Sequence, residues 1–342
     1  MTTTNTRVVL SRHPVGEATP DCFSIETQPL EDLQDGMVRV AVDYISVDAG
    51  TRTMLKGEGF HNQVGLGETI LAGGVGRVIA STVEGWEVGQ VVRGGLGAQT
   101  VATVAPELLE HIDDSRAPAQ AYLGVLSEST GITAWIGVRD VARPQKGDVF
   151  VVSAAAGAVG AIAGQIAKID GARVIGIAGG KRKTDYLLNE LGFDAAIDYK
   201  NENVSERLRA LAPDGVNIFY DNVGGPILDA VLDNLAMQAR VVICGAVSQY
   251  DDMDNVTGPS NYLRLAERQS TMAGFAYFHF ANSFAPAAAE LSQWLADGSV
   301  VLPEEILQGI ERYPEALQFM FSGGNLGKLL VKANRGPRAS PK

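Results

Sequence analysis

The spacing of apolar residues changes near residue 125, and the change separates two kinds of segment. Over the first ~120 residues, short apolar runs are broken by Gly, Pro and Asp, a pattern typical of a β-rich domain. The runs predict strands at 38–42, 70–72, 75–79 and 91–92, with turns at Gly73-Gly74, Gly85 and Gly94-Gly95.

Beyond Val125, apolar runs alternate with stretches in which apolar residues recur every three or four positions. In the stretch 157–169, for example, Val159, Ile162 and Ile166 fall on one face of a helix. This alternation predicts βαβ units, and therefore a doubly wound parallel sheet of the α/β class. The predicted strands are 148–152, 173–178, 195–197, 216–220, 240–244 and 272–275, and the predicted helices are 157–169, 182–191, 203–211 and 226–235.

The segment after residue 298 returns to β-rich character and ends in an apolar run at 328–331. We expect this segment to rejoin the first domain, so that the chain forms one domain interrupted by another. The tail 334–342 is polar and contains two prolines, and we expect it to be a disordered end.

A loop of small residues follows the first strand of the alternating region. Ser153-Ala-Ala-Ala-Gly157-Ala-Val-Gly160 runs directly into a predicted helix. Small residues let the backbone approach a pyrophosphate, and the helix N-terminus offers unpaired N–H groups and the positive end of the dipole. The loop matches the dinucleotide-binding pattern with Ala in place of its first Gly. The alternative is a tight strand-to-helix turn that needs glycine for steric reasons alone, and the surrounding strand–helix series weakens it.

The end of the next strand indicates which dinucleotide is bound. An NAD site of this type carries an acidic residue about twenty positions on, where it holds the ribose. The strand 173–178 is followed by Gly179-Gly180-Lys181-Arg182-Lys183, which contains no carboxylate. Three cations at a helix N-terminus oppose the helix dipole, and a bound 2′-phosphate would offset that cost. The cluster favours NADP(H) over NAD(H), the alternative being a solvated, charged first turn.

Composition and charge exclude several classes of protein. The 342 residues include 28 Lys and Arg against 40 Asp and Glu, which gives a net charge of −12. A generic nucleic-acid binder needs a basic surface, so this balance argues against one. The sequence has neither an apolar run of the ~18–20 residues that span a membrane nor the basic-then-apolar order of a signal peptide. We therefore expect a cytoplasmic protein with no membrane partner.

Cysteine and histidine usage predicts a site without metal. Two cysteines, Cys22 and Cys244, exclude a disulfide framework and a Cys-rich structural zinc site. Cys22 has no His or Cys at ligand spacing, and the four histidines are dispersed. Cys244 ends an apolar strand, where a buried structural thiol is the usual explanation. The chemistry must then come from the cofactor, while the protein orients and polarises the substrate.

Four motifs resemble, in order along the chain, those of one enzyme family. They are Ala154-Ala-Ala-Gly-Ala-Val-Gly160, Asp221-Asn-Val-Gly-Gly225, Ile243-Cys-Gly-Ala-Val-Ser248 and Gly324-Asn-Leu-Gly-Lys328. With Ser46-Val-Asp48 they cover the chain as far as Lys332. Together they resemble the zinc-free branch of the medium-chain dehydrogenase/reductase superfamily. The closer resemblance is to the NADP-dependent alkenal or one-double-bond reductases, the group that includes prostaglandin reductase and curcumin reductase.

The resemblance implies a domain arrangement and an assembly. A GroES-like, β-rich catalytic domain would comprise residues 1–124 and 299–342, and a Rossmann NADP-binding domain, 125–298, would be inserted into it. The family also implies a homodimer.

The resemblance further implies which residues contact the cofactor. Two assignments have simpler alternatives, because Tyr199 sits where ordinary packing would explain it and Asn325 lies in a glycine-flanked turn. The implied pyrophosphate contacts are Gly157, Ala158, Val159 and Gly160, and the implied 2′-phosphate contacts are Lys183 and Tyr199. The residues implied to line the ribose and nicotinamide are Asn222, Cys244, Gly245, Ala246, Ser248, Tyr250 and Phe275. Asn325 is implied to reach the cofactor from the C-terminal segment.

Two departures from the family pattern fall near the expected substrate pocket. Many relatives carry Asp-Pro-Tyr-Met-Arg in the early loop, whereas this chain reads Asp48-Ala-Gly-Thr-Arg52. Near the sixth strand, Phe275-Ala-Tyr-Phe-His-Phe280 replaces the commoner Phe-Ile-Val-Phe-Asp-Tyr type of run. Arg52, Tyr277 and His279 are therefore candidates for the substrate pocket, although a lone His among aromatic residues is more often packed or exposed than catalytic.

These inferences lead to the hypothesis of 1,4-reduction of an α,β-unsaturated aldehyde or ketone. NADPH would deliver hydride to the β-carbon, neutral donors would stabilise the enolate oxygen, and a proton would reach the α-carbon. Tyr262 is the candidate proton donor, with water as the alternative source and loop packing as the alternative role of Tyr262. The rival functions are an NADPH quinone oxidoreductase of the same superfamily and a non-catalytic NADPH-binding protein.

Overall fold

The computed structural model describes residues 3–57 and 62–334. Its contacts divide the chain into a discontinuous unit, Met1–Leu123 with Glu304–Lys342, and a central unit, Gly124–Pro303. The tail that we expect to be disordered lies outside the described residues from position 335 onward, as does His61. Every helix in the described ranges is too short or too polar to cross a membrane.

The discontinuous unit is built on a seven-stranded sheet in the order β14-β15-β3-β4-β5-β7, with β6 also paired to β3. A separate hairpin joins β1 to β2, and two helices, α1 (Gly50–Thr53) and α9 (Tyr313–Phe321), complete the unit. The strands are β1 (Thr4–Leu10), β2 (Phe23–Pro29), β3 (Val38–Ser46), β4 (Gly74–Ser81), β5 (Val91–Gly94), β6 (Val101–Val104), β7 (Leu109–His111), β14 (Glu304–Gln308) and β15 (Lys328–Lys332).

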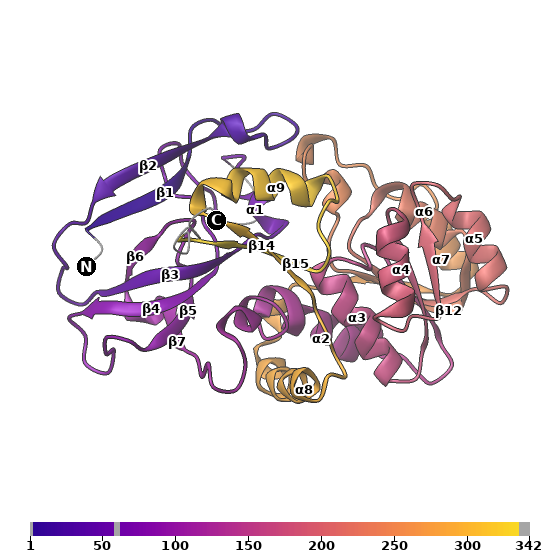
Figure 1. The fold of residues 1–342 in the computed structure, drawn as a ribbon. Coiled ribbons are helices and arrows are strands. Elements are labelled where there is room, and N and C mark those ends of the chain that lie inside the picture. The colour runs from indigo at the N-terminus through magenta and orange to yellow at the C-terminus, as the bar shows by residue number, and fades with distance from the viewer. Residues whose placement is uncertain (1–2, 58–61, 335–342) are drawn as a thin grey trace, which may run out of the picture. The chain divides into compact units, whose positions relative to one another are not determined.

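The C-terminal segment rejoins the N-terminal one, as expected. β15 runs antiparallel to β3, with Leu330 opposite Ser46 and Val331 opposite Ile45. Figure 1 shows this return, because the yellow elements β14, β15 and α9 lie among the indigo and violet strands of the N-terminal segment. The segment is not uniformly β-rich, however, since it also contains the helix α9.

Several predictions in the first 120 residues were wrong. The predicted strand 70–72 does not form a strand, although an isolated bridge joins Thr69 to Val9 and the Ile70 N–H donates to the Val8 carbonyl at 3.0 Å. Gly74 does not form a turn: it begins β4 opposite Gly94, which ends β5. A Cβ on Gly74 would lie 3.0 Å from the Cβ of Leu96, and one on Gly94 would lie 2.1 Å from the Leu108 carbonyl oxygen. These glycines therefore permit close packing within the sheet, which a turn-based interpretation misses.

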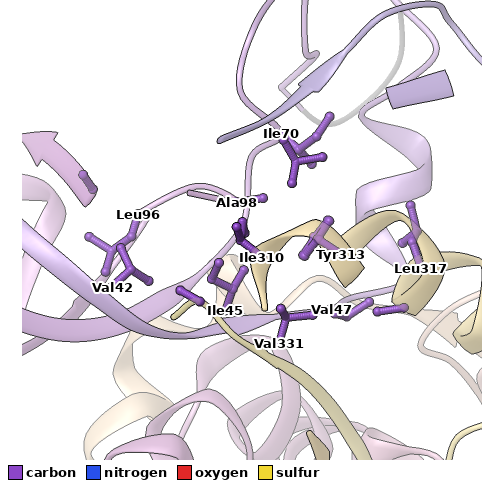
Figure 2. Close-up of a cluster of buried hydrophobic side chains, with 14 of the residues drawn as sticks. Val42, Ile45, Val47, Ile70, Leu96, Ala98, Ile310, Tyr313, Leu317 and Val331 are labelled. Carbon is purple, nitrogen blue, oxygen red and sulfur yellow. The ribbon is translucent and has the colours of Figure 1, made fainter. Parts of the chain in front are cut away.

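The core of the discontinuous unit follows from the alternation along β3. Val38, Val40 and Val42 occupy alternate positions and are fully buried, as expected for a strand with one face on the core. Figure 2 shows Val42 and Ile45 in one cluster with residues of the C-terminal segment, including Tyr313 of α9. The returning segment therefore completes this core.

The central unit contains one six-stranded parallel sheet in the order β10-β9-β8-β11-β12-β13, which confirms the predicted doubly wound sheet. Its strands are β8 (Val149–Val152), β9 (Arg173–Ala178), β10 (Ala195–Asp198), β11 (Val216–Asp221), β12 (Leu235–Ile243) and β13 (Thr271–Gly274). Its helices are α2 (Thr133–Ile136), α3 (Ala158–Ile169), α4 (Lys181–Asn189), α5 (Val204–Leu211), α6 (Gly225–Leu232), α7 (Leu263–Glu267) and α8 (Phe284–Asp297).

One boundary in the central unit differs by several residues from the prediction. The predicted helix 226–235 ends at Leu232, and Leu235 already belongs to β12. β12 starts well before the predicted strand 240–244 because Gln238 adopts φ 60° and the pairing with β11 shifts between Val216 and Ile218. An apolar run that crosses from helix to strand gives no sign of where one element ends.

Helices cover both faces of the sheet (Figure 1). Ile175 and Ile177 of β9 pack in the same cluster as Leu208 of α5 and Leu228 of α6. Gly176, which points to the opposite face, lies against Leu187 of α4. α5 and α6 therefore cover one face and α4 covers the other, as a doubly wound sheet requires.

Candidate functional site

The strand order of the central unit reverses between β8 and β11. From β8 the chain proceeds to β9 and β10 on one side, whereas from β11 it proceeds to β12 and β13 on the other. In open parallel sheets, ligands bind at the carboxyl ends of the strands where the order reverses. The residues that directly follow β8 and β11 therefore define the candidate site.

The loop after β8 leads into the N-terminus of α3. Ala154 adopts φ 47°, and the Gly157 N–H donates to the Ala154 carbonyl at 2.9 Å. A Cβ on Gly160 would lie 2.4 Å from the same carbonyl oxygen, so only glycine fits there. The first turn of α3 leaves the N–H groups of Ala158 and Val159 at its end, where both residues are partly exposed. This geometry suits an anionic group at the helix N-terminus.

A buried carboxylate ties the ends of β8 and β11 together. The Ser153 hydroxyl donates to Asp221 Oδ1 at 2.7 Å, and the N–H groups of Val223 and Gly224 donate to the same carboxylate at 2.9 and 3.0 Å. Asp221 is fully buried, and this burial raises the pKa of its carboxyl group. Sequence reasoning assigned no role to Ser153 or Asp221, although Asp221 begins one quoted motif and Ser153 directly precedes another.

The network also holds Asn222, which directly follows β11. Its backbone N–H donates to the Ser153 hydroxyl and its side-chain amide donates to the Ser153 carbonyl, both at 2.8 Å. Asn222 is therefore fixed to the residue after the neighbouring strand by one backbone bond and one side-chain bond.

The loop after β12 folds back onto Asn222 and its neighbours. Backbone N–H groups of Cys244 and Gly245 donate to the Asp221 carbonyl at 2.8 and 3.2 Å, and the Ser248 hydroxyl donates to the Val223 carbonyl at 2.6 Å. The Ala246 N–H donates to the Tyr250 hydroxyl oxygen at 3.2 Å. The structure thus brings together Asn222, Gly245, Ala246, Ser248 and Tyr250, as their predicted common role requires.

The side chain of Cys244 is part of this packing. The surrounding protein withdraws its thiol from water, which raises its pKa to about 12. A thiol with this pKa is overwhelmingly protonated at neutral pH and is a poor nucleophile. The structural role considered for Cys244 agrees with this environment.

A second group of predicted residues surrounds the turn between β9 and α4. Gly180 caps α4 at φ 91°, and its N–H donates to Asp198 Oδ1 at 2.7 Å. A Cβ on Gly179 would lie 2.9 Å from both the Tyr199 ring and Lys200 Cε, so these side chains pack against the glycine. Tyr199 is 43% exposed. Lys200 is a further cation that sequence reasoning missed, although it directly follows Tyr199.

The cation cluster 181–183 also contains local ion pairing. Lys181 Nζ lies 2.7 Å from the carboxylate of Asp185, one helical turn further on. Its side chain is 85% exposed, so this pair adds little stability. Lys183 lies in the same first turn of α4 and remains the cation assigned to a 2′-phosphate.

The candidate pocket residues of the central unit belong to an aromatic cluster after β13. Phe275 contacts Tyr220 edge-on with ring centroids 6.5 Å apart, and Tyr277 contacts Phe284 at 6.2 Å. The exposed His279 ring lies 4.5 Å from the Phe278 ring. A short, largely aromatic segment thus presents both Tyr277 and His279.

Tyr262 lies apart from the Asp221 network, at the start of α7. The preceding residues, Ser260 and Asn261, are held by N–H groups that donate to Asp229 of α6 at 2.8 and 3.2 Å. Tyr262 itself is 59% exposed. Its hydroxyl is therefore in contact with solvent in this conformation.

The remaining candidates lie in the discontinuous unit. Arg52 in α1 is 3% exposed, and its guanidinium donates to the Gly16 carbonyl at 2.6 Å. Asn325 is 8% exposed, and its amide donates to the Gly327 carbonyl at 3.0 Å, as in a turn that supports itself. Among the residues that the structure describes, no three His, Cys, Asp or Glu side chains are placed to hold a metal ion.

Comparison with known proteins identifies the family. Residues 6–112 match the family described as the N-terminal domain of oxidoreductase, and residues 158–293 match the one described as zinc-binding dehydrogenase. A putative NADP-dependent oxidoreductase, YfmJ, of Bacillus subtilis is 40% identical over 341 residues, which cover 98% of this chain and 99% of that protein. The 2-alkenal reductase (NADP(+)-dependent) of Nicotiana tabacum is 34% identical, with 97% and 98% coverage.

A solved structure supports the same assignment. CurA from Vibrio vulnificus in complex with NADPH is 33% identical and superposes with a TM-score of 0.91, covering 97% of this chain and 100% of that one. The NADPH-dependent curcumin reductase of Escherichia coli is 32% identical, with 96% of each chain covered. This chain belongs to the medium-chain dehydrogenase/reductase superfamily, within the group of alkenal, curcumin and prostaglandin reductases.

Proposed function

We propose that the protein reduces the C=C bond of α,β-unsaturated aldehydes or ketones with NADPH. The observation that carries this proposal is the glycine loop and Asp221 network at the reversal point of the sheet. The identity of 32–34% to 2-alkenal and curcumin reductases, over nearly the whole chain, supports the same proposal.

The residues at this edge fit a dinucleotide phosphate. Gly157, Ala158, Val159 and Gly160 would hold the pyrophosphate, since the partly exposed N–H end of α3 attracts anions and Gly160 leaves no room for a side chain. Lys183 and Tyr199, with the neighbouring Lys200, would hold the 2′-phosphate beside Gly179.

The loop after β12 would form the nicotinamide side of the site. The residues assigned there by the family resemblance are Asn222, Cys244, Gly245, Ala246, Ser248, Tyr250 and Phe275, and the resemblance also assigns Asn325 to the cofactor. Asn222 is fixed by its two bonds to Ser153, so it offers a rigid surface for the ribose. When bound, the cofactor supplies the hydride that reduces the β-carbon.

The protein has to stabilise the charge that develops on the substrate oxygen and to let a proton reach the α-carbon. Neutral donors such as backbone N–H groups can stabilise an enolate oxygen without a metal. The exposed position of Tyr262 favours water as the immediate proton source, with Tyr262 as the alternative. Arg52, Tyr277 and His279 remain the candidates that select the substrate.

Parallel assays with an enone series and a quinone series test the proposal. We expect NADPH-dependent turnover with higher kcat/KM for enals and enones than for quinones. Higher kcat/KM for quinones would favour the quinone oxidoreductase, and NADPH binding without turnover of either series would favour a non-catalytic role. A Tyr262→Phe enzyme with unchanged turnover would remove Tyr262 from the mechanism.

We further propose the domain boundaries 1–124 with 299–342, and 125–298, and a homodimer, on the basis of the family resemblance. The partner that the site is built for is then a small enal or enone. Light scattering of the purified protein measures the dimer directly, and a monomeric mass would contradict that part of the proposal.

A further inference from the structure

The discontinuous unit buries one ammonium group. Lys328 begins β15 and is 1% exposed, and its Nζ lies 2.6 Å from Asp48 Oδ1. The two residues are 280 positions apart in the sequence. A lysine withdrawn from water to this extent needs a nearby carboxylate, because an unpaired buried charge is strongly unfavourable.

Asp48 is itself held in place by the segment around it. The Ser46 hydroxyl donates to its second carboxylate oxygen, and the Thr51 N–H donates to its backbone carbonyl at 3.1 Å. The Val47 N–H donates to the Leu329 carbonyl at 3.2 Å, so the backbones next to both partners are also bonded. Val47, which directly precedes Asp48, belongs with Tyr313 to the apolar cluster of Figure 2.

The pair is part-buried, because the side chain of Lys328 is 2% exposed and that of Asp48 is 32% exposed. Withdrawing a charge from water offsets much of what an ion pair adds to stability. The main effect of the pair between Lys328 and Asp48 is therefore on geometry. It adds a side-chain link between two segments that are also joined by the pairing of β3 with β15 and by the bond from Val47 to Leu329.

Each partner lies within four residues of a candidate contact of the proposed active site. Asp48 lies two residues before the start of α1, which carries Arg52. Lys328 directly follows the turn that carries Asn325, in which the amide is bonded to Gly327. A Cβ on Gly324 would lie 2.0 Å from the Phe319 ring, so α9 constrains the other end of this turn.

We propose that Lys328 and Asp48 are positioning residues that hold the Arg52 segment, on the substrate side, and the Asn325 turn, on the cofactor side, in one fixed arrangement. This inference rests on the proposed function, which assigns those two sides. Neither residue is assigned a chemical step.

The test compares Lys328→Met, Asp48→Asn and the double variant with the wild-type protein. We expect each variant to lower kcat/KM for the enone by about 10–100-fold, because small misplacements of positioning groups have effects of this size. The double variant should be no worse than Lys328→Met, because the two residues act as a unit. KM for both the enone and NADPH should rise, whereas a merely structural defect would lower the amount of active enzyme and leave both KM values unchanged.

A second readout uses the protein without cofactor. Amide hydrogen exchange should become faster in the segments 46–55 and 323–328 together, and remain unchanged in the central unit. The matched control is Arg77→Met with Asp114→Asn, which removes an exposed ion pair of the same unit, with 3.0 Å between its charged atoms, and should change neither readout. If Lys328→Met does not fold, Lys328→Arg keeps the charge and alters its reach, and we expect the same pattern at smaller size.

The outcomes separate the inference from the proposed function. Wild-type protein that reduces no enone contradicts the proposed function, while the exchange comparison still tests the pair. Active wild-type enzyme with unchanged kinetics in the double variant overturns the positioning role. Additive effects of the two substitutions would also overturn the positioning role. Faster exchange in only one of the two segments would overturn it as well.

Discussion

The two units each bury a charged side chain, and they hold it by different means. In the central unit, the carboxylate of Asp221 accepts bonds from the Ser153 hydroxyl and from the N–H groups of Val223 and Gly224, all of which are neutral. In the discontinuous unit, the ammonium of Lys328 faces the opposite charge of Asp48. One charge is stabilised by oriented dipoles and the other by a counter-ion.

The first arrangement depends mainly on backbone groups, whereas the second depends on two side chains. The donors to Asp221 come mainly from the backbone of the turn that follows it, so most substitutions nearby leave them in place. The pair in the other unit depends on two side chains, and the loss of either removes the 2.6 Å contact between them. Neutral dipoles stabilise a buried carboxylate less completely than water does, which is why burial raises the pKa of Asp221.

The largest effect should come from removing the Asp221 carboxylate. Asp221→Ala leaves the Ser153 hydroxyl and two buried N–H groups without their acceptor, so we expect the free energy of unfolding to fall by about 3–5 kcal/mol. NADPH affinity should fall at least tenfold, because Asn222 loses its fixed position. Denaturant titration and cofactor fluorescence measure the two losses. The control is Asp214→Ala at an exposed position, and its free energy of unfolding should stay within about 0.5 kcal/mol of the wild-type value. A loss of stability there as large as in Asp221→Ala would contradict a specific role of the Asp221 hydrogen bonds.

Because the proposed phosphate site is formed mainly by backbone groups, it should also be sensitive to atoms added in the turn between β8 and α3. Gly160→Ala places a Cβ 2.4 Å from the Ala154 carbonyl oxygen, so the turn has to shift. We expect about 1–3 kcal/mol of destabilisation and weaker NADPH binding. Gly95→Ala is the matched control, since nothing lies within 4 Å of its added Cβ. Unchanged NADPH affinity in Gly160→Ala would show that this loop does not hold the pyrophosphate.

The cation cluster contains one cation that is assigned to the 2′-phosphate, Lys183, and one that is not, Lys181. Lys183→Ala should reduce the preference for NADPH over NADH by about tenfold, the size of one charge-assisted hydrogen bond. Lys181→Ala should have a much smaller effect, because the exposed Lys181 is paired with Asp185. The ratio of kcat/KM values for the two cofactors measures both variants, and equal losses would contradict the assignment of Lys183 alone.

The smallest effect concerns the pH dependence of stability. The folded-state pKa of Asp221 is raised above its ordinary value of 3.8, so the folded protein binds this proton more tightly than the unfolded chain. Stability from this group is therefore present at low pH and is lost as pH rises from about 4 through the folded pKa. Relative to Asp221→Asn, which cannot titrate, the wild-type protein should lose stability over that range. Denaturant titrations at several pH values measure the difference, and a gain with rising pH would reverse the sign.

The central unit was largely predictable because its signals are local and periodic. The six parallel strands and the Ser153–Gly160 loop follow from apolar spacing and from glycine at the turn. Sequence reasoning missed the bond between Ser153 and Asp221 and the packing of Lys200 beside Gly179, because both depend on which strands become adjacent.

The discontinuous unit was harder to predict. β2 is exposed over most of its length and shows no clean alternation, and the glycines that begin β4 and end β5 suggest turns. The pair of Asp48 and Lys328 lies in motifs that were quoted, yet nothing in a linear reading links positions 280 apart. Such a contact becomes visible only when β15 is known to lie against β3.

The return of β15 to β3 has a consequence for the order of events during synthesis. Gly124–Pro303 is continuous, so the ribosome delivers all of its strands before the last strands of the other unit exist. β3 leaves the ribosome early, yet the edge that β15 covers stays open for about 15–60 s at ordinary rates of about 5–20 residues per second. A nascent chain with an open edge is exposed to wrong pairing and to chaperone binding. Asp48 meets its counter-ion only after almost the whole chain has been made.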